Sequence, residues 1–284
     1  MKLLNIDKDL LLKPLQLVSG IVERRHTLPI LSNVMLKIGN QKLEVFATDL
    51  EIQISTSVAL ENDNTEEAVT ISARKTLDIL RALPDKTKIS LEASDTRAVL
   101  RGGKSKFNLQ TLPSNDFPLI EARDRTTVDT VQIQEKAFKS MLQKVQFSMA
   151  QQDIRYYLNG LLVVIDQDEL TLVATDGHRM SHISTKIPDS KCKREVILPR
   201  KTVLELVKLL GDDDNQVTIG ITDTQANIEF SGVTIVTKLV DGKFPDYKRV
   251  IPNQLSNSLL IERETLQGAL QRAAVLSNEK FRGV

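Results

Sequence analysis

The stretch LSNVMLKIGNQKLEVFATDLE at residues 31–51 decides the fold, because YLNGLLVVIDQDELTLVATDGHR at residues 157–179 repeats its pattern. Thr48 of the first stretch corresponds to Thr175 of the second, an offset of 127 residues. In both stretches apolar and polar residues alternate with period two, which is typical of half-buried strands. The sequence therefore predicts an internal repeat.

Two further pairs of segments keep the same offset. SARKTLDILRALP at residues 72–84 matches LPRKTVLELVKLLGD at residues 198–212, and FNLQTLPSNDFP at residues 107–118 matches TIVTKLVDGKFP at residues 234–245. Anchor residues in both pairs lie 126 or 127 residues apart. Because the anchors recur in a constant order, chance similarity is a poor explanation.

An amphipathic helix is expected at the start of each copy. IDKDLLLKPLQLV at residues 6–18, IQEKAFKSMLQKV at residues 133–145 and LLIERETLQGALQRAAVL at residues 259–276 carry a Leu-Gln pair in the same register. The chain stops at Val284, one helix into a third copy. Since a lone amphipathic helix cannot bury its apolar stripe, we expect a truncated third copy and an intact protein of about three repeats.

Each copy is predicted to contain a helix, several alternating strands, a second helix and more strands. Runs of strands interrupted by one helix favour an α+β fold in which two helices pack on antiparallel sheet. We expect domains at residues 1–127 and 128–256, followed by the first helix of a third domain at residues 257–284. Pro14 removes a helical hydrogen bond, so we expect it in the first turns of its helix or at a distortion.

Composition narrows the class of protein. The chain has 284 residues, of which 41% are hydrophobic and 26% charged, so two or more globular units are expected. No apolar run approaches the roughly 18 residues of a membrane span, and we expect a cytoplasmic protein. Cys192 is the single cysteine and there are three histidines, which argues against a disulfide framework, a metal centre or a cofactor.

The near-neutral net charge of +1 hides a segregation. The predicted helices at residues 8–18, 74–83, 135–146 and 200–210 hold eleven lysines and arginines but four acids, a net charge of +7, which leaves −6 on the remainder. Basic helices lining one surface would meet DNA phosphates without reading sequence. One such helix would be interpreted as an ordinary solvated face, but four repeated helices with the same bias make DNA binding an equal alternative to that interpretation.

ATDGHRM at residues 174–180 invites an enzymatic interpretation, in which Asp176 and His178 together act as the catalytic base and Ser181 is the nucleophile. A catalytic triad must converge in space, whereas neighbours in one strand and turn point in alternating directions. The shared Thr-Asp pair, which includes Asp49 in the first copy, is better explained as a turn device. A metal-dependent DNA-processing enzyme using Asp49 and Asp176 is the alternative, although neither has a second acid nearby. A purely structural repeat scaffold is a third possibility, against which the charge segregation counts.

At this level of detail the chain resembles the bacterial beta sliding clamps, the beta subunits of DNA polymerase III. The segments that carry the resemblance over the whole length are HTLPILSN, ATDLE, FSMAQQDIRYYLNG, VATDGHR, PRK, KLVDGKFPDY and LSNEKFRGV. The resemblance implies a non-catalytic processivity factor of a DNA polymerase holoenzyme, a homodimeric ring of three-domain subunits around double-stranded DNA. Its implied partners are DNA polymerases, the clamp loader, mismatch-repair proteins and other proteins with a clamp-binding motif.

The resemblance also assigns residues to three surfaces. The implied partner-peptide cleft uses Arg155, Tyr157, Leu158, Thr175, Gly177, His178, Arg179, Met180, Pro245, Arg249 and Val250. The implied DNA contacts are Arg25, Arg74, Gln152, Arg200 and Lys201, and the implied dimer interface joins Phe107 and Leu109 to Val275 and Leu276 of a partner. Met180 replaces a more usual leucine, a volume-conserving change that softens the pocket.

Overall fold

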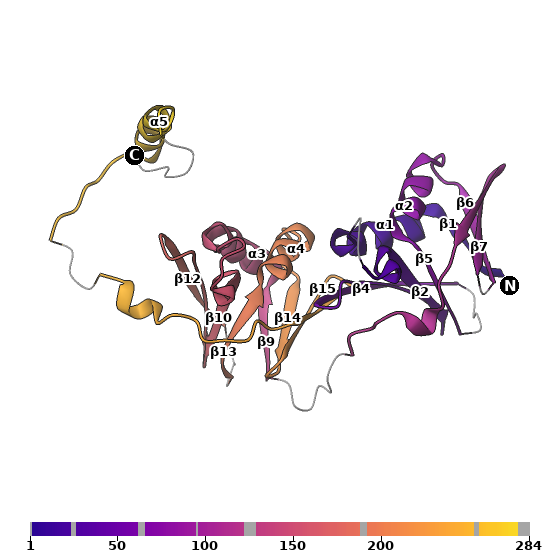
Figure 1. Ribbon diagram of the computed structural model, residues 1–284, viewed down its shortest axis with the longest axis horizontal. Coiled ribbons are helices and arrows are strands. Elements are labelled where there is room, and N and C mark those ends of the chain that lie inside the picture. Colours follow the sequence, from indigo (N-terminus) through magenta and orange to yellow (C-terminus); the bar gives the residue numbers. More distant parts are fainter. Residues whose placement is uncertain are drawn as a thin grey trace. The chain divides into compact units, whose positions relative to one another are not determined.

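The computed structural model describes residues 2–23, 27–61, 66–94, 96–121, 129–187, 192–252 and 256–277 (Figure 1). The chain divides into two compact units, residues 1–244 and 245–284, and each is described by itself. The larger unit holds both complete copies of the repeat.

Among the described residues of the first repeat, eight strands and two α-helices are present, and the strands form two antiparallel four-stranded arrangements. Its elements are β1 (Lys2–Asp7), α1 (Lys8–Val18), β2 (Asn33–Gly39), β3 (Lys42–Thr48), β4 (Ile52–Ala59), β5 (Glu67–Ser72), α2 (Ala73–Ala82), β6 (Lys88–Ser94), β7 (Arg97–Gly102) and β8 (Ser105–Gln110). The strand orders are β1-β6-β7-β8 and β5-β2-β3-β4. All pairings are antiparallel.

The second repeat has the same order of elements. They are β9 (Asp129–Gln134), α3 (Glu135–Val145), β10 (Gly160–Asp166), β11 (Glu169–Thr175), β12 (Met180–Lys186), β13 (Lys193–Pro199), α4 (Arg200–Leu209), β14 (Gln216–Ile221), β15 (Gln225–Phe230) and β16 (Val233–Lys238). Its strand orders, β12-β11-β10-β13 and β16-β15-β14-β9, match those of the first repeat strand for strand. The predicted α+β fold with two helices on antiparallel sheet is confirmed.

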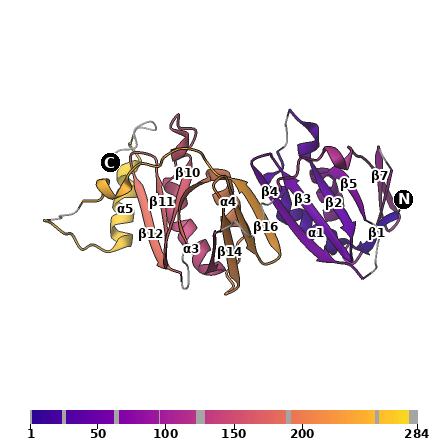
Figure 2. The ribbon, with the colours of Figure 1, turned by 90° about the horizontal axis from the view of Figure 1, so that it is seen from below.

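A main-chain ladder joins the two repeats into one sheet. β4 of the first repeat pairs antiparallel with β16 of the second, from Val233 opposite Thr56 to Thr237 opposite Ile52, which gives an eight-stranded sheet. The two strands run side by side in Figure 2. In Figure 1 the helices α1 to α4 lie in a row above this sheet. Within each repeat the two helices also pack on one another.

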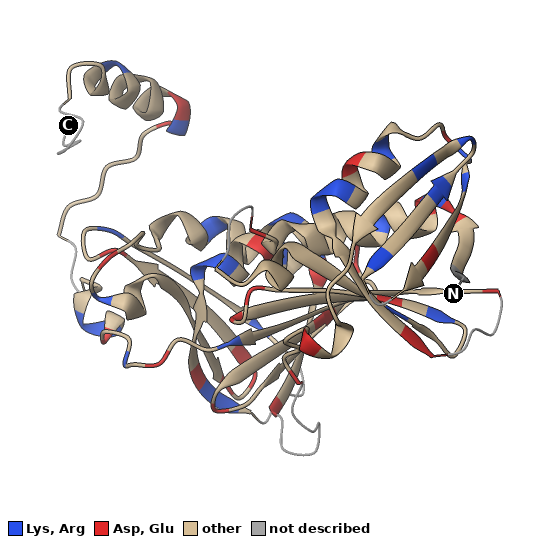
Figure 3. Cartoon of the chain, turned by 45° about the vertical axis from the view of Figure 1, so that its right-hand side comes forward, with Lys and Arg blue, Asp and Glu red and all other residues tan. Residues whose placement is uncertain are grey.

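The helices form because each carries an apolar stripe at helical spacing. In α1 Leu11, Leu15 and Val18 are buried, and in α3 Phe138 and Leu142 are buried. Burying an aliphatic or aromatic side chain contributes about 1.5–3 kcal/mol, so these faces fix the helices on the sheets. Many of the lysines and arginines on these helices are exposed, and Figure 3 shows how they are distributed along the chain.

Pro14 lies in the interior of the 11-residue helix α1 and is buried. The alternative expectation, a distortion of the helix at this residue, stays a prediction. Proline lacks the N–H that would bond to the carbonyl four residues earlier. The helix nevertheless continues through Pro14 to Val18.

The smaller unit contains α5 (Arg263–Ala274), which lies within the amphipathic stretch predicted at residues 259–276. None of its residues is buried. Across the described residues, no helix combines the length and the apolar character that crossing a membrane requires.

Candidate DNA and peptide-binding sites

The turn between β11 and β12 is built by Thr175 and Asp176. The Thr175 hydroxyl accepts a hydrogen bond from the Gly177 amide at 3.1 Å, and Asp176 Oδ1 accepts from the amides of His178 and Arg179 at 2.9 and 3.0 Å. Gly177 has a φ of +87°, which glycine adopts without steric cost. Burial acts to raise the pKa of Asp176, but hydrogen bonds from His178 and Arg179 outweigh it and leave the pKa below its usual value.

The first repeat builds the same turn between β3 and β4. The Thr48 hydroxyl accepts from the Leu50 amide at 3.1 Å, and Asp49 Oδ1 accepts from the amides of Glu51 and Ile52, both at 2.9 Å. Leu50 stands where the second repeat has glycine and has a φ of +81°. The interpretation of Thr-Asp as a turn device is therefore confirmed.

The catalytic interpretation of this segment finds no support in the geometry. The Ser181 hydroxyl shares a hydrogen bond of 2.7 Å with the Ser148 hydroxyl, and Asp176 is committed to the backbone of its own turn. Among the described residues, no group of three His, Cys, Asp or Glu side chains is arranged to hold a metal ion. The suggested metal ligands Asp49 and Asp176 lie in separate repeats, each inside its own turn.

Arg155 ties the preceding loop to this turn. Its guanidinium donates to both carboxylate oxygens of Asp153, at 3.0 and 2.8 Å, and to the carbonyl oxygen of Asp176 at 3.3 Å. The hydrogen bonds from Arg155 lower the pKa of Asp153 to about 2. A Cβ at Gly177 would lie 3.1 Å from Arg155 Nη1, so a glycine gives the guanidinium room to approach.

Most of the predicted cleft residues are brought together by these contacts. Leu158 is buried at the end of the short helix Tyr156–Leu158, and Met180 begins β12 directly after the turn and is partly exposed. Tyr156 and Tyr157 pack edge to face with ring centroids 5.8 Å apart. The structure thus places Arg155 against the turn at Asp176 and Gly177, and pairs Thr175 with Met180 across that turn.

Three predicted cleft residues, Pro245, Arg249 and Val250, belong to the smaller unit. There Arg249 Nε pairs with Asp246 Oδ2 at 2.8 Å, and the Val250 side chain is exposed. The cleft that would join the two sets of residues stays a prediction.

Two contacts of this surface were missed by sequence reasoning. Arg179 donates to the carbonyl oxygen of Phe147 at 2.6 Å and lies 5.6 Å from the centroid of the Phe147 ring. Asp153 closes its loop by accepting the Arg155 amide at 2.8 Å. An Asp two residues before a bonded amide is a recognisable turn signal, whereas no local pattern links Phe147 to Arg179.

The predicted DNA contacts have different surroundings. Arg25 lies outside the described residues. Arg74 is exposed on α2 and lies 3.8 Å from Asp78 in a surface pair. Gln152 adopts a φ of +56° in an exposed loop, and Arg200 donates to the carbonyl oxygen of Met149 at 3.1 Å.

Lys201, also a predicted DNA contact, is bound by two carboxylates. Its Nζ donates to Glu23 Oε1 at 3.0 Å and to Asp49 Oδ2. Burial acts to lower the pKa of Lys201, but the hydrogen bonds to Asp49 and Glu23 outweigh it, so the pKa is raised. Lys201 is therefore charged and already paired.

The predicted dimer-interface residues lie on exposed or edge elements. Phe107 and Leu109 are on β8, the last strand of its sheet, with Leu109 buried and Phe107 partly buried. Val275 and Leu276 follow α5 in the smaller unit and are 78% and 95% exposed. Whether these pairs meet across two subunits stays a prediction.

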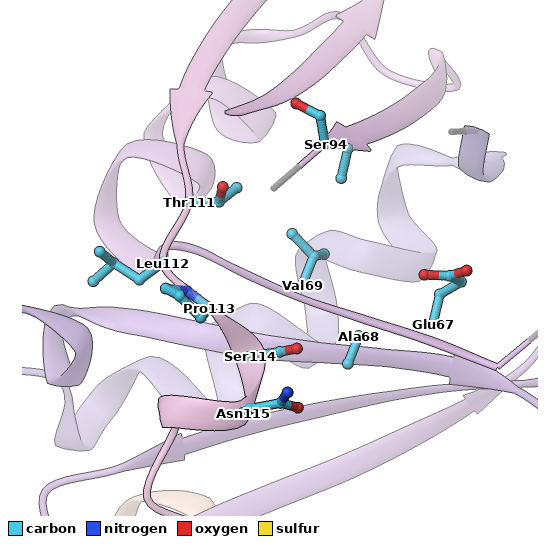
Figure 4. A pocket seen from close by; sticks show the side chains of 10 residues that line it. Glu67, Ala68, Val69, Ser94, Thr111, Leu112, Pro113, Ser114 and Asn115 are labelled. Atoms are coloured by element: carbon cyan, nitrogen blue, oxygen red, sulfur yellow. The ribbon is translucent and has the colours of Figure 1, made fainter. Parts of the chain in front are cut away.

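Two grooves occupy equivalent places in the repeats. One of about 480 Å³ lies between the start of β5, the end of β6 and residues 111–115, with Val69, Thr111 and Asn115 around it in Figure 4. Its counterpart of about 520 Å³ lies beside β13 and residues 239–244. Both repeats have this groove, and no predicted site residue lines either of the two grooves. The groove is therefore a property of the repeated fold.

Comparison with known families identifies both repeats. The model of the DNA polymerase III beta subunit, N-terminal domain, matches residues 1–121. The model of the central domain of the same subunit matches residues 132–246.

Individual proteins are similar to this chain in sequence and structure over nearly its whole length. A beta sliding clamp of Vibrio cholerae is 44% identical over 279 residues, and one of Pseudomonas putida is 41% identical over 280; each alignment covers 98% of this chain and 76% of the relative. A solved sliding clamp of Pseudomonas aeruginosa, bound to griselimycin, is similar with a TM-score of 0.91 at 41% identity, covering 98% of this chain and 75% of that one.

Proposed function

Because the chain belongs to the DNA polymerase III beta-subunit family, the bacterial beta sliding clamps, we propose that it confers processivity on a replicative polymerase by encircling duplex DNA and docking partner peptides. The chain is not an enzyme, because its relatives are beta sliding clamps, which are non-catalytic processivity factors. The metal-dependent alternative using Asp49 and Asp176 is not supported. A replicative role supports a cytoplasmic location, which is part of the proposal.

The arrangement of the sheet edges is the observation that supports assembly into a ring. β4 of the first repeat pairs with β16 of the second. By the repeat, the remaining equivalents are β12 and β8, and in the described part of the chain each is an edge strand. A contact between two different edges is heterologous, and repeating it produces a ring when the rotation closes. This supports domains at residues 1–127 and 128–256, a third beginning at residue 257, and a homodimer of full-length subunits.

The basic helices support sequence-independent DNA binding. Arg74 is the second residue of α2, and Arg200 is the first residue of α4, the equivalent helix of the second repeat. Lysine and arginine contacts to phosphate release counterions, so the logarithm of affinity falls with the logarithm of salt concentration by roughly 0.9 per contact.

Binding of short duplexes of different sequence tests this, measured by fluorescence anisotropy between roughly 50 and 200 mM salt. We expect weak binding that is insensitive to sequence and falls steeply with salt, and that Arg200→Ala weakens further. Lys193→Ala, an exposed lysine on β13, is the control. Preference for one sequence or a flat salt dependence would contradict the proposal.

For the peptide cleft we propose that Leu158, Thr175 and Met180 form an apolar pocket with Pro245 and Val250, flanked by arginines. Hydrophobic anchors in a concave site generally dominate such binding. Met180→Ala should therefore weaken a clamp-binding peptide by about 1–3 kcal/mol. The partners that would carry such peptides are polymerases, the clamp loader and mismatch-repair proteins.

Calorimetry on the intact protein measures this change, and Asp212→Ala is its matched control because that carboxylate is exposed and outside the pocket. If Met180→Ala binds the peptide as tightly as the parent protein, the pocket has been placed wrongly.

A further inference from the structure

Lys201 connects the two repeats through side chains. It is the second residue of α4 in the second repeat, and both of its ion-pair partners, Glu23 and Asp49, are in loops of the first repeat. The Asp49 side chain is only 9% exposed, and that of Lys201 is 36% exposed. The contact is therefore partly removed from solvent, where ion pairs are less screened than on the surface.

The charges at this point do not suit a phosphate ligand. One ammonium faces two carboxylates, so the cluster carries a net charge of −1. A phosphate that captured Lys201 would leave Asp49, nearly buried, without its cation, and an unpaired buried charge is strongly unfavourable. The raised pKa of Lys201 agrees with an ammonium held by its neighbours.

Lys75 provides an internal comparison. It occupies the same repeat position in α2, yet it is exposed and forms no ion pair with any described residue. The repeated helix therefore does not generate the pairing by itself. The pairing arises because the turn of the first repeat lies against the helix of the second.

The two partners of Lys201 lie next to the junction between the repeats and next to a predicted DNA contact. Asp49 closes the turn that leads into β4, the strand that pairs with β16. Glu23 lies two residues before the predicted DNA contact Arg25. α4 also meets the segment that precedes Glu23, because a Cβ added at Gly20 would collide with Glu205 Oε2.

We propose that Lys201 is a positioning residue that fixes α4 to the Asp49 turn and to the Glu23 loop, and that it does not contact DNA phosphate. This rests on the proposed DNA binding only in assigning what Lys201 does not do. Its structural part, the fixing of the β4 to β16 junction, stands independently.

The test compares Lys201→Met with Lys75→Met in the full chain, using two measurements. Amide hydrogen exchange at Ile52–Thr56 and Val233–Thr237 reports on the junction, and the salt dependence of duplex binding reports on phosphate contacts. We expect Lys201→Met to speed exchange at these amides about tenfold or more and to leave the salt slope unchanged. Lys75→Met should leave the exchange unchanged.

Either of two results overturns the proposal: exchange in Lys201→Met equal to that of the parent, or a salt slope that falls by about 0.9, the value for one lost phosphate contact. If Lys201→Met does not fold, the same two measurements are made on Asp49→Asn. It should also speed exchange without changing the slope, whereas a lysine freed to bind phosphate would steepen it. If the parent protein binds no DNA, the proposed function fails while the exchange measurement still decides the role of Lys201.

Discussion

The two Thr-Asp turns have the same backbone and different surroundings. In the first repeat, Asp49 uses one oxygen to close its turn and the other to bind Lys201 of the second repeat. In the second repeat, Asp176 closes its turn in the same way but pairs with Arg179, three residues along. One copy is thus a joint between repeats, while the other is a local structure with an exposed surface.

This difference separates what the fold requires from what a site requires. The Thr hydroxyl, the Asp oxygen and a residue with positive φ are shared, so they serve the turn. The substitutions around them, glycine for Leu50 and Arg179 in place of a distant lysine, leave the second turn open beside Arg155. A duplicated turn can therefore supply a surface for a partner once it is released from holding its neighbour.

Alanine at the two aspartates should give the largest contrast. Asp49→Ala removes two backbone hydrogen bonds and the Lys201 pair from a nearly buried position, and we expect a loss of about 3 kcal/mol in the free energy of unfolding. Asp176→Ala removes similar bonds at a side chain that is 25% exposed, and we expect about 1 kcal/mol. Denaturant unfolding measures both, and the reverse order would refute the comparison.

Exchanging the residues with positive φ should have an intermediate effect. Gly177→Leu places a side chain at a φ of +87° and against Arg155, and such strained positions cost about 1–3 kcal/mol. Leu50→Gly relieves the backbone but loses side-chain contacts, so we expect a net change within about 1 kcal/mol. Gly177→Ala separates backbone strain from side-chain size. Equal effects of the two exchanges would contradict the assignment of the cost to backbone strain at a positive φ.

The smallest effect concerns the acid behaviour of the Asp153 loop. The pKa of Asp153 is about 2, below its ordinary value of 3.8, so the stabilisation from Arg155 is complete above the ordinary value and is lost as pH falls through about 2. Titration of the carboxyl carbon followed by NMR measures this. Arg155→Gln should return the pKa of Asp153 towards 3.8; a value that stays near 2 in the variant would assign the shift to another cause.

The repeat made much of the fold predictable from sequence. Helices expected at residues 8–18, 74–83, 135–146 and 200–210 begin and end within one residue of those observed, because apolar spacing is a local signal. The family and the non-catalytic role are also confirmed. The interior position of Pro14 was not predictable, because the missing N–H of proline disfavours the interior of a helix.

The candidate site was predictable only in part. The resemblance grouped Arg155, Thr175 and Met180, which the structure places at one turn. It gave no indication that Lys201 pairs with Asp49, because a contact between residues 152 positions apart depends on how two repeats pack. Arg25 and the residues of the smaller unit stay predictions.

The ladder between β4 and β16 has a mechanical consequence. Five residue pairs must separate together before the two repeats can bend apart at this junction, whereas contacts made by side chains alone can yield one at a time. The junction therefore behaves as a stiff plate and not as a hinge.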